Sequence, residues 1–193
     1  MIHSVLIFNN DGLPRLLKFY TPVDIPTQQL LLKQIHKLVI GRPSNQCSFL
    51  TPPPLLEDEK YSDLKIIYRH YATLFFVFVV DEQESELGIL DLIQVFVEVL
   101  DKCFENVCEL DLVFGWQVLE TCLEEIIQGG MVTDTTIVKI VNAVDEANKQ
   151  VKASSSSGMI NLGGNNNQGQ NRGVFSTTSL WNAMDSRLSG WGR

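Results

Sequence analysis

The sequence predicts an α+β fold of the α/β class, in which helices flank an antiparallel β-sheet. One observation is the order of the segments in the 193-residue chain: two strands, a helix, a short strand and two further strands, with hairpin-type connections, followed by three helices. The other is the run at residues 73–80, where both sets of alternating side chains are apolar. Such a strand needs cover on both faces, so helices are expected on both sides of the sheet.

The N-terminal segment predicts a β-hairpin. Residues 2–8 are apolar on both alternating faces, and residues 15–20 have the pattern of a return strand. Between them lies Asn9-Asn10-Asp11-Gly12. Asn and Gly tolerate the positive φ angles of tight turns, so this stretch is expected to connect the two strands.

A helix is predicted next, with Asp24 as its cap and Pro26 in its first turn. Its periodic positions, spaced by three and four residues, are Leu30, Leu31, Gln34, Ile35 and Leu38. Gly41-Arg42-Pro43 is expected to end it, because proline cannot continue a helix. A short strand at residues 46–51 and a proline-rich, acidic loop up to residue 63 follow.

Two further strands are predicted at residues 64–71 and 73–80. The second has Leu74, Phe76 and Phe78 on one face and Phe75, Val77 and Val79 on the other.

Three helices are expected to complete the body. The first, residues 85–105, is opened by a capping box of Asp81 and Glu84, and it is apolar around most of its circumference. A helix of this kind is normally buried on two sides, which is more cover than one sheet face provides. The second is predicted at residues 110–128, before Gly129-Gly130, and the third is capped by Thr133 or Asp134 and ends near Val151.

Composition divides the chain into two parts. Residues 1–151 carry 11 Lys and Arg against 22 Asp and Glu, which argues against binding to nucleic acid or to anionic lipid. Residues 152–193 are rich in Ser, Gly, Asn and Gln, so a disordered low-complexity tail is expected there. Without a signal peptide, a spanning segment or a lipidation motif, we expect a cytosolic protein that reaches membranes only through partners.

The residues that usually carry catalysis do not form a recognisable motif. The histidines, His3, His36 and His70, have no HExxH context, and neither GxSxG nor a P-loop is present. The acidic group from Asp81 to Glu86 lacks the spacing of a calcium loop and is typical of a solvated helix start. The four cysteines contain no CxxC and are expected to be reduced thiols. Neither enzymatic activity nor a metal or cofactor is expected.

Three segments carry a resemblance to a known family. They are MIHSVLIFNNDGLPRLLKFY at the start, IIYRHYATLFF at residues 66–76 and FVEVLDKCFENVCELDLVF at residues 96–114. They resemble the small (sigma) subunits of the adaptor complexes of vesicle coats, with Phe75 where the family usually has Tyr. ESELGILDLIQ at residues 84–94 is most similar to the sigma subunits of the third adaptor complex.

This resemblance implies a longin-like fold for residues 1–151, with a five-stranded antiparallel sheet and helices on both faces. It implies assembly into a heterotetramer of two large subunits, one medium and one small subunit. The small subunit would be held by the N-terminal solenoid of a delta-type large subunit, which we expect to cover the second apolar side of helix 85–105. The complex would be peripheral on Golgi and endosomal membranes and coated vesicles, in transport towards lysosomes or the vacuole.

The resemblance also implies a cargo site for acidic dileucine signals of the form [DE]xxxL[LI]. The leucine-binding surface would comprise Ala72, Leu74, Val97, Asn106, Val107 and Leu112, with Asn106 as a hydrogen-bond partner of the peptide backbone. Arg15 would attract the acidic residue four positions before the leucines. Without the resemblance, these apolar residues would be read as ordinary core and Arg15 as a surface ion pair.

Two other classes of binding protein remain open. One is a different longin-type small chain, from another adaptor class or the zeta subunit of coatomer. The other is a longin-type regulator of membrane fusion, which would require a heptad-bearing helix and an anchor after the domain; residues 152–193 contain neither.

Overall fold

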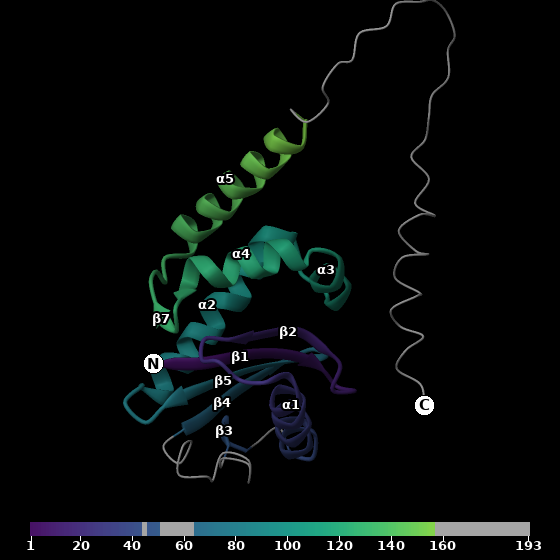
Figure 1. The fold of residues 1–193 in the computed structure, drawn as a ribbon, viewed down its shortest axis with the longest axis vertical. Coiled ribbons are helices and arrows are strands. Elements are labelled where there is room, and N and C mark those ends of the chain that lie inside the picture. Colours follow the sequence, from purple (N-terminus) through teal and green to yellow (C-terminus); the bar gives the residue numbers. More distant parts are fainter. Residues whose placement is uncertain (44–45, 51–63, 157–193) are drawn as a thin grey trace, which may run out of the picture. The chain divides into compact units, whose positions relative to one another are not determined.

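Five strands form one antiparallel sheet in the order β2-β1-β5-β4-β3 (Figure 1). The computed structural model describes residues 1–43, 46–50 and 64–156, with side chains described as far as residue 150. The strands are β1 Ile2–Asn9, β2 Pro14–Phe19, β3 Phe49–Leu50, β4 Leu64–Tyr71 and β5 Leu74–Asp81. The predicted hairpin, the central pair of strands and the sheet between helices are therefore confirmed.

The helices are α1 Ile25–Ile40, α2 Glu86–Phe104, α3 Glu109–Phe114, α4 Trp116–Ile126 and α5 Ile137–Ser156. A small second sheet, β6 Ile127–Gln128 with β7 Met131–Val132, connects α4 to α5. The proline-rich loop up to residue 63 and the tail from residue 157 lie outside the described residues.

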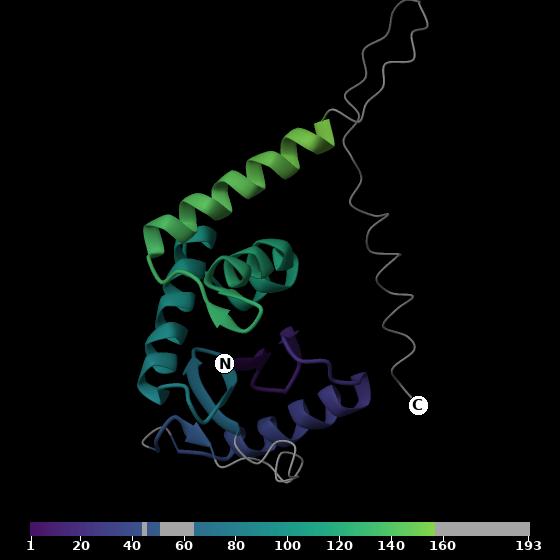
Figure 2. The ribbon, with the colours of Figure 1, turned by 60° about the vertical axis from the view of Figure 1, so that its left-hand side comes forward.

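Strand β5 has the two apolar faces that the sequence predicted. Phe76 and Phe78 pack with α2 in one core, whereas Phe75 and Val77 pack with α1 in the other. Figures 1 and 2 show α1 on one side of the sheet and α2 on the other. The alternation of side chains along β5 thus places a helix on each face.

Helix α1 begins and ends as predicted. The Asp24 carboxylate accepts a hydrogen bond from the Thr27 backbone N–H at 3.2 Å, and Gly41 follows the last turn. Its buried residues face β1, β4 and β5; they are Leu31, Leu32, Ile35 and Val39.

The start of α2 differs from the prediction. The N-cap is Ser85, whose hydroxyl accepts a hydrogen bond from the Gly88 N–H at 3.3 Å. Asp81 instead accepts hydrogen bonds from the backbone N–H groups of Gln83 and Glu84, both at 3.2 Å, and so closes the turn between β5 and the helix. The proposed capping box of Asp81 and Glu84 is therefore wrong.

The predicted single helix at residues 110–128 is interrupted. Gly115 separates α3 from α4, and the last two predicted helical residues form β6. A Cβ atom at Gly115 would lie 2.5 Å from a ring carbon of Phe104 and 2.8 Å from the Asp111 carbonyl oxygen. The chain bends here because only glycine allows α3 to pack this closely against the end of α2.

The second apolar side of α2 is covered by this chain itself. Helices α4 and α5 both pack on α2, and their buried side chains belong to the same core as those of α2. The prediction of two-sided burial is correct for α2, but our argument that this excess of apolar surface requires a partner is wrong. The later helices provide the cover (Figure 2).

Helix α5 begins later and ends later than predicted. It starts at Ile137 and reaches Ser156 instead of ending near Val151. In the turn before it, the Asp134 carboxylate accepts a hydrogen bond from the Thr136 N–H at 2.8 Å. Ile140 and Val144 are its fully buried contacts with the core.

The cover that α5 gives to α2 can be measured with two substitutions in one helix. Ile140→Ala should lower the free energy of unfolding by about 2–5 kcal/mol, because it leaves a cavity beneath α5. Val138→Ala, at a side chain that is 65% exposed, should change it by less than about 0.5 kcal/mol. The measurement is urea unfolding of both variants. Equal effects would show that α5 does not cover the core.

Candidate functional site

A cavity of about 320 Å³ lies where the β4–β5 turn, α2 and α3 meet. Five of the six residues predicted to bind leucine line it, namely Ala72, Leu74, Val97, Val107 and Leu112. They come from four separate stretches of the sequence, and the structure brings them together.

The cavity has a buried apolar floor and a more accessible rim. Leu74, the first residue of β5, and Leu112 on α3 are buried, with Phe76 and Leu100 beside them. Val97 and Val107 are half-buried, and Ala72 is exposed. Branched apolar side chains that are only partly covered offer a surface from which a second apolar side chain can displace water.

Backbone strain is concentrated around this cavity. Among the described residues other than glycine, those with positive φ are Ala72 at 51°, Glu105 at 51° and Asn106 at 80°. Ala72 lies in the turn between β4 and β5, and Glu105 and Asn106 end α2. A left-handed conformation costs a residue with a Cβ atom about 1–2 kcal/mol. Strain of this kind often accompanies functional sites, so it supports a role for the cavity.

Asn106, the sixth predicted residue, is exposed at the turn and does not line the cavity. Its backbone N–H donates to the Asp101 carbonyl at 3.2 Å, and the Val107 N–H donates to the Asp101 carboxylate at 3.2 Å. The turn directs the chain back so that Val107 reaches the cavity. Asn106 suits this position because its short polar side chain is among those that best tolerate a left-handed conformation.

Arg15 forms an ion pair with Glu109, a residue at the cavity rim. Its Nε and one terminal nitrogen donate to the same carboxylate oxygen of Glu109, at 3.1 and 2.7 Å. The Thr73 hydroxyl donates to the other oxygen at 2.9 Å. These hydrogen bonds, that from Arg15 foremost, lower the pKa of the Glu109 carboxyl. The Arg15 cation is therefore beside the cavity, but its charge is already matched within the chain.

Glu109 belongs to this site but is not among the residues predicted from the sequence. Glu109 lies in the segment that carries the resemblance, but its contact with Arg15 spans 94 positions of the sequence. A contact over that distance has no local sequence signal.

Two of the four cysteines contact each other in the core on the α2 side, whereas Cys47 and Cys108 are exposed. The Sγ atoms of Cys103 and Cys122 are 3.7 Å apart, and this contact together with burial raises the pKa of the Cys122 thiol. All four cysteines are free thiols. Within residues 1–43, 46–50 and 64–156, no group of three or more His, Cys, Asp or Glu side chains is arranged to hold a metal ion. None of the helices in this part of the chain has both the length and the apolar character needed to span a bilayer.

Comparison with known proteins defines the class of protein. The family model of the clathrin adaptor complex small chain matches residues 1–151. The chain belongs to this family, and its five-stranded sheet between helices is the longin-like fold that the resemblance implied.

Within that family, the chain is similar to sigma subunits of AP-3 complexes. It is 73% identical over 160 residues to the clathrin-associated protein AP-3 complex component APS3 of Candida albicans, covering 83% of this chain and 90% of the relative. It is 57% identical over 165 residues to the AP-3 complex subunit sigma of Saccharomyces cerevisiae (81% and 85% covered). It is 51% identical over 153 residues to the human AP-3 complex subunit sigma-2 (79% and 78% covered).

A structural match agrees with these relatives. One chain in a homology model of the full-length AP-3 complex, in a stretched open conformation, superposes with a TM-score of 0.64 at 57% identity. The match covers 81% of this chain and 99% of that chain.

The ion pair at the rim predicts a pH dependence. Because the pKa of Glu109 is lowered in the folded chain, its contribution to stability is complete above the ordinary pKa of a Glu side chain. That contribution is lost as the pH falls through the lowered value. Arg15→Gln should raise the pKa of Glu109 towards the ordinary range of a Glu side chain, and Thr73→Val should raise it less. Carbon-13 NMR titration of the Glu carboxyl groups measures both, and an unchanged Glu109 pKa in Arg15→Gln would exclude the pair.

Proposed function

We propose that this chain is the sigma subunit of an AP-3-type adaptor complex, a heterotetramer of two large subunits, one medium and one small subunit. In this role it stabilises the complex and helps to bind acidic dileucine signals in cargo, without catalysis. The observation that carries the proposal is the convergence of Ala72, Leu74, Val97, Val107 and Leu112 on one cavity, in a chain of the adaptor small-chain family.

The transport step follows from the class of complex. We propose that the assembled complex lies on the cytosolic face of Golgi and endosomal membranes and carries cargo to lysosomes or the vacuole. The chain would reach the membrane through its partners. Its described helices include none able to span a bilayer, and its net charge of −8 disfavours direct binding to anionic lipid.

The large subunit needs a docking surface, and much of the apolar surface of α2 is already covered by α4 and α5. At the junction of α3 and α4, Leu110, Phe114 and Trp116 are 63%, 71% and 55% exposed. Three large apolar side chains so close together and so exposed are typical of an interface. We propose that the solenoid of a delta-type large subunit packs on these residues, next to α3 and hence next to the leucine cavity.

Binding of cargo would combine burial of leucine with recognition of an acid. Burial of one leucine side chain is worth about 1.5–3 kcal/mol. The cargo acid, four positions before the leucines, would be attracted by Arg15. Since Arg15 is already ion-paired with Glu109, the cargo carboxylate would share Arg15 with Glu109 or displace Glu109 from it. The charge of Arg15 would thus add little affinity by itself.

The test is binding of an acidic dileucine peptide, with its Ala-Ala version as control, to the purified pair of this chain and the delta subunit. Val97→Asp should abolish the difference between the two peptides, because an unpaired charge in the cavity cancels most of the gain from burial of about one leucine. Complex assembly should persist, because Val97 is only half-buried. Val138→Asp, at an exposed position on α5, is the matched control and should leave binding unchanged.

Two charge variants separate the acidic part of the signal from the leucines. Arg15→Ser should weaken peptide binding by only about 0–1 kcal/mol, and less at high salt. Glu109→Gln should strengthen peptide binding, because Arg15 loses its internal partner.

If Val97→Asp leaves both complex assembly and peptide affinity untouched, the cavity is not the leucine site. If it destroys assembly, Val97 belongs to the structural core.

A further inference from the structure

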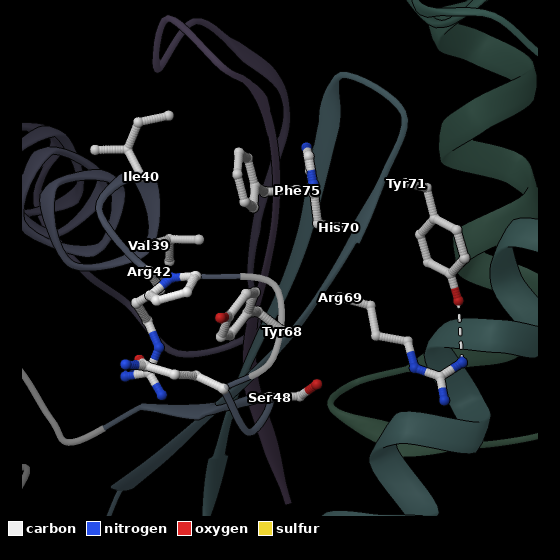
Figure 3. A pocket seen from close by; sticks show the side chains of 11 residues that line it. Val39, Ile40, Arg42, Ser48, Tyr68, Arg69, His70, Tyr71 and Phe75 are labelled. Carbon is white, nitrogen blue, oxygen red and sulfur yellow. Dashed lines mark hydrogen bonds between the residues drawn. The ribbon is translucent and has the colours of Figure 1, made fainter.

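A second hollow, of about 510 Å³, lies beside the outer edge of β4, and the function proposed above does not use it. Its walls come from the end of α1, residues 42–43 and 46–48, β4 and β5 (Figure 3). Tyr68, His70 and Phe75 lie on the same side as Val39 and Ile40, whereas Arg69 and Tyr71 extend towards the α2 side. The hollow thus lies mainly on the α1 face, across the sheet from the leucine cavity.

The strand edge beside this hollow has no neighbour in the part of the chain that the structure describes. Strand β3 pairs with Ile66 and Ile67 only, and the Tyr68 N–H then donates to the Ser48 carbonyl at 2.9 Å. In an antiparallel ladder, alternate residues direct both backbone groups to the same side. The N–H and C=O of His70 therefore point outward, where a further strand has its place.

Aromatic side chains form a rigid wall next to this edge. The His70 ring stacks on Phe75 with 4.1 Å between centroids, and Tyr68 packs against Phe75 at 6.4 Å. An added strand would direct every second side chain onto this wall, since side chains alternate between the faces of a sheet.

The charge of the hollow is opposite to that of the chain. Its lining contains neither Asp nor Glu, although the chain carries a net charge of −8. The lining cation on the α1 face is Arg42, since the Arg69 guanidinium donates to Tyr71 and Gln94 on the α2 side. The Arg42 guanidinium donates to the carbonyls of Cys47 and Phe49, lies 6.0 Å from the Tyr68 ring, and has a buried Nε with no hydrogen-bond partner. Among the described residues no carboxylate pairs with Arg42, in contrast to Arg15.

We propose that this hollow binds an extended acidic segment of a partner protein, which adds a strand to β4 and places a carboxylate on Arg42. The free edge selects an extended backbone, the aromatic wall accepts its alternate side chains, and Arg42 selects for negative charge. This site is independent of the dileucine cavity, so either can exist without the other.

The test uses the full chain, labelled with nitrogen-15, and an eight-residue peptide of Val and Thr with two adjacent Glu residues. Because side chains alternate between the faces of a strand, one of the two carboxylates then lies on the face of the aromatic wall and Arg42. The peptide should shift the amide signals of residues 68–71 and the side-chain Nε–H of Arg42. The same peptide with Gln in place of Glu should bind about tenfold more weakly, the loss expected when a charge-assisted hydrogen bond is removed. A version N-methylated at alternate residues, which cannot join a ladder, should not bind.

Two protein variants complete the test. Arg42→Gln should weaken the Glu peptide about tenfold and leave the Gln peptide unchanged. Lys65→Gln removes one positive charge from the same strand, but its partner is Glu86, so it should have no effect. Equal binding of the Glu and Gln peptides, undiminished binding of the N-methylated peptide, or an inert Arg42→Gln would overturn the proposal. Edge signals that shift with protein concentration alone would assign the edge to a second copy of the chain, which also overturns it.

Discussion

The central strand β5 cannot expose either of its faces to water, and the rest of the structure follows from this constraint. Seven consecutive side chains of this strand, from Leu74 to Val80, are buried. The faces alternate, so one half requires α1 and the other half requires α2. Helix α2 is itself apolar around most of its circumference and in turn requires α4 and α5. Burial therefore proceeds outward from one strand in successive layers.

The cavity proposed to bind leucine lies at one end of β5 and α2, beyond these packed layers. Just before β5 the chain turns at Ala72, and at the end of α2 it turns at Glu105 and Asn106. All three residues have positive φ. Helix α3 follows this second turn, and its buried Leu112 forms part of the cavity floor. The cavity is thus bounded by turns that the sheet and α2 hold in place. Leu74, Leu100 and Leu112 are both members of the core and part of the cavity lining.

Local patterns predicted most of the fold, and long-range contacts account for the remainder. The faces of β5, the cap at Asp24 and the two-sided burial of α2 follow from spacing alone. The break at Gly115 does not, because its cause is a close approach to Phe104. The partner of α2 was assigned wrongly for the same reason, since periodicity shows that a face is buried but not what covers it. The residues proposed to bind leucine came from the family resemblance, whereas the pairing of Arg15 with Glu109 and the hollow at Arg42 required the three-dimensional structure.

We propose that cargo leucines enter the cavity between β5, α2 and α3. Intermolecular nuclear Overhauser effects test it directly, with a methyl-labelled dileucine peptide bound to this chain in its pair with the delta subunit. We expect contacts from the peptide leucine methyl groups to those of Val97, Val107 and Leu112, and none to Val39 or Val138. A bound peptide whose leucines contact Val39, on the opposite face of the sheet, would contradict it.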